Sequence, residues 1–194
     1  MTEFLNLLRD KLTDHQTTFE RTAADERMMH SCEKAAEMMV DAVRNHKNLL
    51  FCGNGGSAAD AQHAAAELVG RYLKVRRAIS AESLCVDPSI LTAIGNDYGY
   101  DFIFSRQVEA KGKEGDVFFA ISTSGKSSNI LKALEVASQK GLKKILLTSE
   151  RAPEDVRKLC DAVIAVPSKD TPRIQEVHVF VLHLLCEYIE NKIS

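Results

Sequence analysis

The chain has 194 residues and is 45% hydrophobic, which is enough apolar material for a sizeable core and argues against wholesale disorder. It carries 25 basic and 27 acidic residues, a formal net charge of −2. This balance argues against a broad basic surface for nucleic acid and against a polybasic patch for a membrane. An anionic ligand would therefore have to be held by local groups.

The cellular compartment is indicated by the start of the chain and by the cysteines. The first ten residues include acidic side chains and lack the apolar core of a signal peptide. No apolar run reaches the roughly 18 residues that a membrane span needs. The five cysteines are far apart and form no Cys-x-x-Cys pair: Cys32, Cys52, Cys85, Cys160 and Cys186. This pattern predicts reduced thiols in a cytoplasmic protein.

Helical segments and short apolar runs alternate along the chain. The first quarter reads as helical, because apolar residues recur at helical spacing over residues 27–46. Five short apolar runs predict buried strands at 48–52, 78–81, 116–121, 144–148 and 162–166. Helices are expected from the Gly-rich turn to about 71, twice within 88–111, over about 127–140 and over about 172–191.

This alternation predicts an α/β fold, a doubly wound, flavodoxin-like parallel sheet of five strands with helices on both faces. One domain is expected, with extra N-terminal helices over residues 1–46 and the α/β core over 47–194. The segment 177–186 is apolar on almost every face, so its helix should be buried all round. Its extra face would meet another subunit or lie in the centre of the core, and the N-terminal helices offer a second association surface.

Two loops have the composition of a phosphate site. Residues 52–58, Cys-Gly-Asn-Gly-Gly-Ser-Ala, follow the first strand and open a helix, where free N–H groups attract anions. Residues 122–129 follow the third strand and place five hydroxyl side chains and a glycine at another helix start. A cluster of N-caps is the ordinary alternative, but one cap accounts for one hydroxyl and hardly for five. In the strand order 2-1-3-4-5 both loops would face one pocket at the switch point of the sheet.

Two nucleotide motifs are nearly matched. Gly125-Lys126-Ser127 looks like the end of a P-loop, but Ala120 stands where that pattern needs glycine. Residues 53–58 fit the looser dinucleotide fingerprint, and Glu82 lies near the end of the second strand. An NAD-dependent enzyme is therefore a rival hypothesis, although the chain is short for a separate substrate domain.

Histidine and glutamate residues on two predicted helices could carry acid/base or metal chemistry. His63 and Glu67 are four residues apart and share a helix face, about 6 Å apart along the axis. Taken alone, an ordinary surface pair is the better interpretation. Gln175, His178 and His183 lie on the last helix, where a buried histidine needs a partner. Gln175 and His183 are about 12 Å apart along a straight helix, so reaching one ion would need inward reach, a late helix start or sharing between subunits.

These segments closely resemble the bacterial sedoheptulose-7-phosphate isomerases of the SIS (sugar isomerase) domain family. The resemblance rests on CGNGGSAADAQH at 52–63, ELVGRY at 67–72, LTAIGND at 91–97, ISTSGKS at 121–127 and RIQEVH at 173–178. It covers nearly the whole chain, with the motifs in order. It implies conversion of sedoheptulose 7-phosphate into D-glycero-D-manno-heptose 7-phosphate, an early step toward ADP-heptose and the lipopolysaccharide core. It also implies a homotetramer with active sites shared between subunits and one zinc ion per subunit.

The resemblance also implies roles for particular residues. The metal-ligand positions of the family fall on His63, Glu67, Gln175 and His183. Its substrate-contacting positions fall on Asn54, Gly55, Gly56, Asn96, Asp97, Ser122, Thr123, Ser124 and Ser127, to which Glu67 and Gln175 are added. Its acid/base pair falls on Glu67 and His183. One class of SIS relatives binds a replication initiator without being known as an isomerase and lacks these two residues, so their presence favours the enzyme.

Overall fold

The strands form the sheet that their apolar runs predict. The computed structural model describes residues 2–193. Its five strands are β1 (Leu49–Gly53), β2 (Ala81–Ser83), β3 (Val117–Ile121), β4 (Lys143–Ser149) and β5 (Ala162–Val166). They pair in parallel in the order β2-β1-β3-β4-β5. This order confirms the predicted doubly wound architecture.

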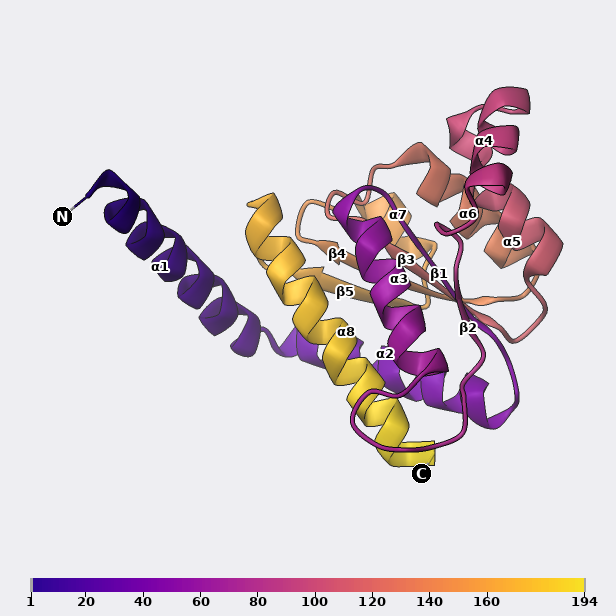
Figure 1. Cartoon of the computed structure of the whole chain (residues 1–194), viewed down its shortest axis with the longest axis horizontal. Helices are drawn as coiled ribbons and strands as arrows, with labels where there is room; N and C mark the ends of the chain where they lie inside the picture. Colours follow the sequence, from indigo (N-terminus) through magenta and orange to yellow (C-terminus); the bar gives the residue numbers. More distant parts are fainter. Residues whose placement is uncertain (1, 194) are drawn as a thin grey trace.

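Helices cover both faces of the sheet (Figure 1). They are α1 (Glu3–Ala23), α2 (Glu26–Arg44), α3 (Gly56–Val69), α4 (Pro88–Asp97), α5 (Ser105–Lys111), α6 (Ser128–Gln139), α7 (Glu154–Lys158) and α8 (Thr171–Ile193), with a 3-10 turn, η1, at Tyr100–Phe102. Within residues 2–193 no helix combines the length and apolar character needed to cross a membrane.

Two apolar clusters lie on the two faces of the sheet, one on each. Leu49 and Phe51 of β1 pack with α2, α3 and α8, whereas Leu50 and Cys52 pack with α5, α6 and Val156 of α7. Successive strand residues point to opposite faces, so a strand buried on both sides reads as a continuous apolar run. This explains why the strands could be located from sequence.

Three local predictions were inaccurate. The second strand pairs over Ala81–Ser83 and not over 78–81, because Ile79 donates its backbone N–H to Leu68 O of α3, 3.2 Å away, instead of joining the sheet. The helix expected to reach about residue 71 ends at Val69. The short helix α7 was not predicted, since five residues are too few to show a periodic pattern.

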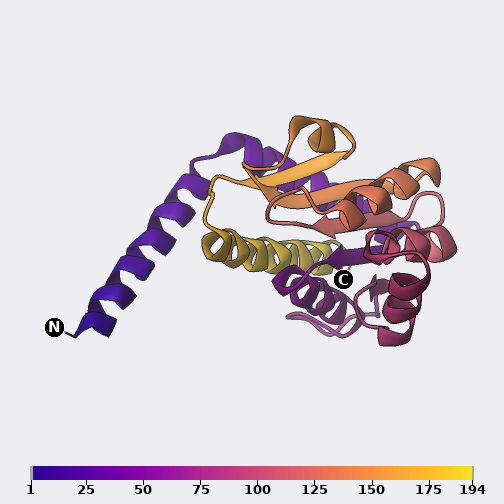
Figure 2. The same cartoon turned by 90° about the horizontal axis from the view of Figure 1, so that it is seen from above.

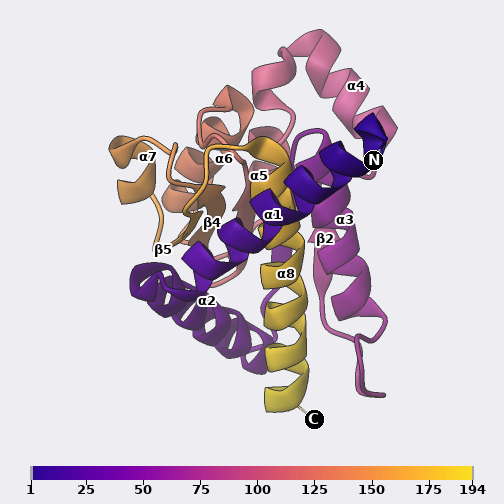
Figure 3. The same ribbon diagram turned by 90° about the vertical axis from the view of Figure 1, so that its left-hand side faces the viewer.

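The N-terminal helix α1 leaves the body of the fold (Figure 2) and crosses α8 (Figure 3). Polar contacts hold it there: His15 Nδ1 lies 2.8 Å from Glu176 Oε2, and Arg173 Nη1 donates to Lys11 O at 3.0 Å. Few of its residues are buried. The body of the chain therefore covers only one side of this helix.

Candidate functional site

The first Gly-rich loop joins β1 to α3 through a backbone that only glycine adopts easily. Gly55 has φ +57° and precedes the first residue of α3, with no side chain capping the helix. A Cβ at Gly56 would collide with Nε2 of Gln175, so α8 packs directly against the start of α3. The N–H groups of Ser57, Ala58 and Ala59 donate to Asn54 O and Gly55 O, so at the start of α3 the N–H group of Gly56 is the one available to an anion.

The second loop joins β3 to α6 and keeps its hydroxyl groups close together. Ser122 Oγ accepts from the N–H of Gly125 at 3.1 Å and lies 3.5 Å from Ser127 Oγ, while Ser124 Oγ accepts from the N–H of Lys126. Ser127 occupies the N-cap position of α6 but makes no side-chain capping bond. Capping therefore does not account for these hydroxyls, and the amide groups at the start of α6 remain open.

An amide pair ties the two loops together. Asn54 Nδ2 donates to Asn129 Oδ1 at 2.9 Å, and Asn129 Nδ2 donates back to Asn54 Oδ1 at 3.0 Å. The hydroxyl of Tyr100 also donates to Asn54 Oδ1, at 3.0 Å. The two loops thus lie side by side at the carboxyl edge of the sheet, as the strand order predicts. Asn129 and Tyr100 were not among the predicted site residues.

Asn96 and Asp97 lie on α4, whose residues are all at least partly exposed. Their side chains contact each other, with Asn96 Nδ2 donating to Asp97 Oδ1 at 2.8 Å. The segment that follows is fastened to the second loop, because Asp101 accepts from the hydroxyl of Ser128 and Tyr100 reaches Asn54. The substrate-binding role of Asn96 and Asp97 remains a prediction, and the segment that follows them borders both loops.

A polar cluster forms where α3 and α8 lie side by side (Figure 1). His63 Nε2 lies 3.1 Å from Glu67 Oε1 and 3.4 Å from His183 Nε2. The Glu67 side chain is 25% exposed and that of His63 is 43% exposed, so the cluster is open to solvent. The pair that the spacing predicted on α3 thus gains a third member from α8, 120 residues away from His63.

The short contacts of this cluster cannot all be hydrogen bonds, which favours a bound cation. The Nε2 atom of His63 carries at most one proton, and a carboxylate only accepts. It therefore cannot donate to Glu67 and also accept from His183. Two imidazoles and a carboxylate are ligands that zinc commonly takes. The contacts nevertheless run in series through His63, and no group of three His, Cys, Asp or Glu side chains within residues 2–193 is arranged to hold a metal.

Gln175 lies apart from these three side chains. It packs against Gly56, seven residues before His63 on α3 and about 10 Å along that helix. On α8 it precedes His183 by eight residues. Three of the four predicted ligand positions thus meet within one chain, while Gln175 borders the Gly-rich loop.

Two further residues clarify the alternatives weighed from sequence. His178 is fully buried, and Nε2 of its ring lies 3.0 Å from Thr148 O, while Nδ1 has no hydrogen-bond partner among the described residues. It is therefore a core histidine and not a member of the cluster. Burial lowers the pKa of His178 to about 4, although the bond to the Thr148 carbonyl raises it. Glu82, the acidic residue that would bind a dinucleotide ribose, forms an ion pair with Lys111 instead.

The family model for the SIS domain matches residues 14–149. The chain is 48% identical over 187 residues to the phosphoheptose isomerase of a Nitratiruptor species, covering 96% of this chain and 98% of that protein. It is 50% identical over 180 residues to the phosphoheptose isomerase of Aliarcobacter butzleri, covering 93% and 94%. The chain therefore belongs to the SIS domain family.

Solved structures agree with this assignment. A phosphoheptose isomerase from Neisseria gonorrhoeae superposes with a TM-score of 0.90 at 36% identity, covering 97% of this chain and 99% of that one. One from Francisella tularensis gives a TM-score of 0.92 at 34% identity, covering 98% and 100%. The fold and the chain length of these enzymes are thus reproduced here.

Proposed function

We propose that this protein is a phosphoheptose isomerase, converting sedoheptulose 7-phosphate into D-glycero-D-manno-heptose 7-phosphate through an enediol. The observation that carries the proposal is the meeting of Glu67 with His63 and His183, on helices that begin beside two anion-binding loops. The relatives named above bear the name of this activity and match nearly the whole chain.

The phosphate end of the substrate would lie at the two loops. The N–H group of Gly56, the open amides of α6 and the hydroxyls of Ser122, Ser124 and Ser127 are suited to phosphate oxygens. The amide pair of Asn54 and Asn129 supports this role, because it keeps both loops in one place. Binding energy from this remote group would orient the reacting carbons.

The reacting end would lie at the polar cluster. Glu67 would remove a proton from C1 of the ketose while the C2 carbonyl oxygen gains one, giving the enediol. A proton then leaves the C1 hydroxyl as C2 is protonated, giving the aldehyde. His183 is the partner acid in this scheme, and each such group typically contributes ~10²–10⁴ in rate.

Zinc is part of the proposal, one ion per subunit, held by His63, Glu67 and His183 of one chain and by Gln175 of a neighbouring subunit, because Gln175 of the same chain packs against Gly56. The imidazole, carboxylate and amide groups of these residues are suitable donors, and the unmatched protons around His63 support a cation there. Bound zinc would polarise the carbonyl oxygen as a Lewis acid. Glu67 would have to serve as both ligand and base, or leave the metal during turnover.

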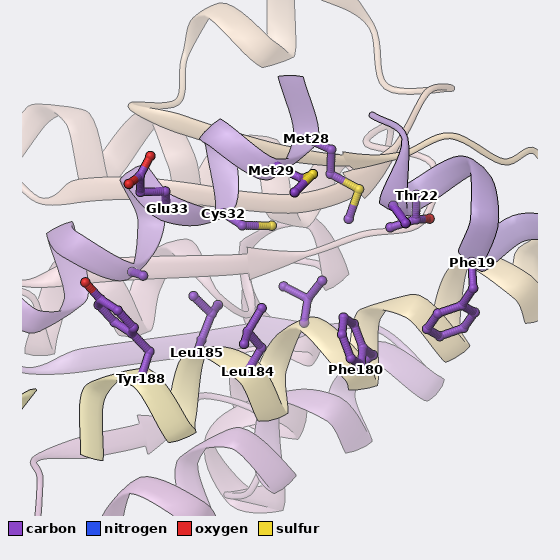
Figure 4. Close-up of a pocket in the computed structure, with 13 residues that line it drawn as sticks. Phe19, Thr22, Met28, Met29, Cys32, Glu33, Phe180, Leu184, Leu185 and Tyr188 are labelled. Carbon is purple, nitrogen blue, oxygen red and sulfur yellow. The ribbon is translucent and has the colours of Figure 1, made fainter. Parts of the chain in front are cut away.

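We also propose assembly into a homotetramer in the cytoplasm, with active sites shared between subunits. An apolar groove of about 490 Å³ runs between α8 and the N-terminal helices, lined by residues including Phe19, Met28, Cys32, Phe180, Leu184 and Tyr188. Figure 4 shows the α8 side chains pointing toward those of α2. Phe4, Leu7 and Leu8 of α1 are also exposed. Exposed apolar surface of this kind is typical of subunit contacts, and the five free thiols support a reducing compartment.

The direct test is NMR of sedoheptulose 7-phosphate incubated with the purified protein. We expect aldose signals to grow without added dinucleotide and to be slowed by a chelator. A substrate spectrum that stays unchanged would contradict the isomerase and favour a binding protein of the same family. A requirement for added NAD, with a change in absorbance, would favour the dinucleotide enzyme.

A further inference from the structure

A buried ion pair holds the segment 70–80 that follows α3. Arg76 Nε lies 3.3 Å from Glu190 Oε1 of α8, and the two side chains are 2% and 1% exposed. Glu190 also accepts from the backbone N–H groups of Tyr72 at 3.1 Å and of Leu73 and Lys74 at 2.7 Å each. Burying a charge pair is costly unless further hydrogen bonds satisfy it, and here the loop backbone supplies them.

The other end of Arg76 reaches the last turn of α3. Its Nη2 donates to Glu67 O at 2.8 Å, and its Nη1 donates to Leu68 O at 2.8 Å and Gly70 O at 3.1 Å. The last carbonyls of a helix have no partner within the helix, and a cation near them is favourable. Arg76 therefore fixes the backbone of the turn that carries Glu67.

The same segment touches His183. The ring of Tyr72 stacks on the His183 ring, with centroids 5.4 Å apart and an angle of 29° between the planes. The backbone N–H of Tyr72 is one of the three from which Glu190 accepts. His183 and Glu190 are seven residues apart on α8, two turns along one face. One helix therefore holds both the histidine and the carboxylate that fixes its neighbour.

We infer that Arg76 and Glu190 are positioning residues that hold Glu67 and His183 in place relative to each other. Arg76 acts through the last turn of α3, and Glu190 acts through the backbone and ring of Tyr72. The inference rests on the proposed function only in taking Glu67 and His183 as the reacting groups. Misplacement of such groups by about 1 Å costs up to ~10²-fold in rate.

Asp116, the residue directly before β3, offers a matched control. Its buried carboxylate accepts from the backbone N–H groups of Asn48 at 2.8 Å and Lys113 at 2.9 Å. Replacing Asp116 by Asn removes the same kind of bond as replacing Glu190 by Gln, since each leaves backbone donors with a weaker acceptor. None of the Asp116 contacts reaches α3 or α8.

The first experiment compares Glu190→Gln with Asp116→Asn in the intact, metal-loaded enzyme. Glu190→Gln should lower kcat by ~10-fold or more with KM changed by less than about threefold, because the reacting groups move while the phosphate loops stay. Both variants should lower Tm by similar amounts, but Asp116→Asn should leave kcat within about twofold of the parent. Equal values of kcat for the two variants would overturn the inference.

A second pair of variants separates positioning from folding. Arg76→Lys keeps the charge but loses the forked contacts to Glu67 O and Leu68 O, so kcat should fall while the charge pair persists. Tyr72→Leu removes the ring that stacks on His183, and Tyr72→Phe restores it. We expect Tyr72→Leu to lower kcat and Tyr72→Phe to recover most of it, and equal kcat for these two would contradict the role of the ring.

The ring NMR signals of His183 provide a readout that does not depend on activity. They are assigned by their loss in His183→Gln, and they should shift in Tyr72→Leu and Glu190→Gln but not in Asp116→Asn. If the parent chain proves inactive and these shifts still occur, the proposed function fails and the positioning stands. If the parent is active and the signals do not move, the positioning inference fails alone.

Discussion

The two sides of α8 differ in how completely one chain satisfies them. On the side toward α3, His183 contacts His63 at 3.4 Å and Glu190 accepts three backbone hydrogen bonds. On a neighbouring side, about a quarter of a turn round the helix, Phe180 and Leu184 remain 50% and 45% exposed. The polar side finds its partners within one chain, whereas the apolar side does not.

One helix thus carries the polar cluster on one side and a candidate subunit contact on another. Burying a polar group without a partner costs free energy, so the fold places partners beside these groups. Apolar groups need only another apolar surface, and a second copy of the chain can supply it. A third side of α8 faces the sheet, where His178 is fully buried. The two histidines of α8 therefore have different environments five residues apart.

The largest effect is expected on the polar side, from Glu67→Gln. Loss of the carboxylate should lower kcat by ~10²-fold or more, because the base is removed, while the phosphate loops still bind substrate. Steady-state kinetics and calorimetric titration with sedoheptulose 7-phosphate measure the two effects. Glu135→Gln, at an exposed position of α6, is the control. Near-normal kcat in Glu67→Gln would remove Glu67 from its role as the base.

The next effect concerns acid stability and compares the two histidines of α8. Burial lowers the pKa of His178 from 6.5 to about 4 in the folded chain, and the bond to Thr148 O opposes this shift only in part. The unfolded chain therefore binds the proton more readily, so this contribution is complete above pH 6.5 and is lost as the pH falls toward 4. The loss amounts to ~3 kcal/mol at most, from 1.36 kcal/mol per pKa unit.

Urea unfolding between pH 6.5 and 5 measures this slope. In His178→Asn the part of the slope due to this histidine should disappear, whereas in His183→Asn it should remain. Identical slopes in the parent and in His178→Asn would show that burial does not govern the titration of this residue.

A change in molecular mass is expected from the apolar side. Phe180→Glu combined with Leu184→Glu places two charges in the apolar groove, so the assembly should dissociate. Sedimentation or light scattering measures the mass. Leu159→Glu, which charges an apolar residue after α7, should leave the mass unchanged. A parent chain that is already monomeric would contradict the proposed association.

The smallest effect is expected from Ser124→Ala in the second loop. One hydroxyl bond to a charged phosphate contributes about 1.5–3 kcal/mol, so KM should rise ~10-fold or more while kcat changes little. Ser138→Ala, on the exposed side of α6, is the control. Unchanged KM in Ser124→Ala would exclude this hydroxyl from the phosphate site.

The sequence predicted the parts of the site that depend on neighbours along the chain. The Gly-rich loop at 53–56, the hydroxyl loop at 122–127 and the His63–Glu67 pair are short-range patterns. Their adjacency also followed, because parallel strands in the order 2-1-3-4-5 bring their carboxyl ends to one edge. The position of β2 did not follow, since Ile79 bonds to α3 rather than to β1.

Four of the five strands and both loops could thus be located from the sequence, because apolar runs and turn residues act locally. Tertiary structure alone decided which side chains meet across distant segments. Arg76 with Glu190, Tyr72 with His183 and Asn54 with Asn129 are separated by 75 to 114 residues. Each contact depends on the relative placement of packed elements, which is set by the whole core rather than by spacing within one segment.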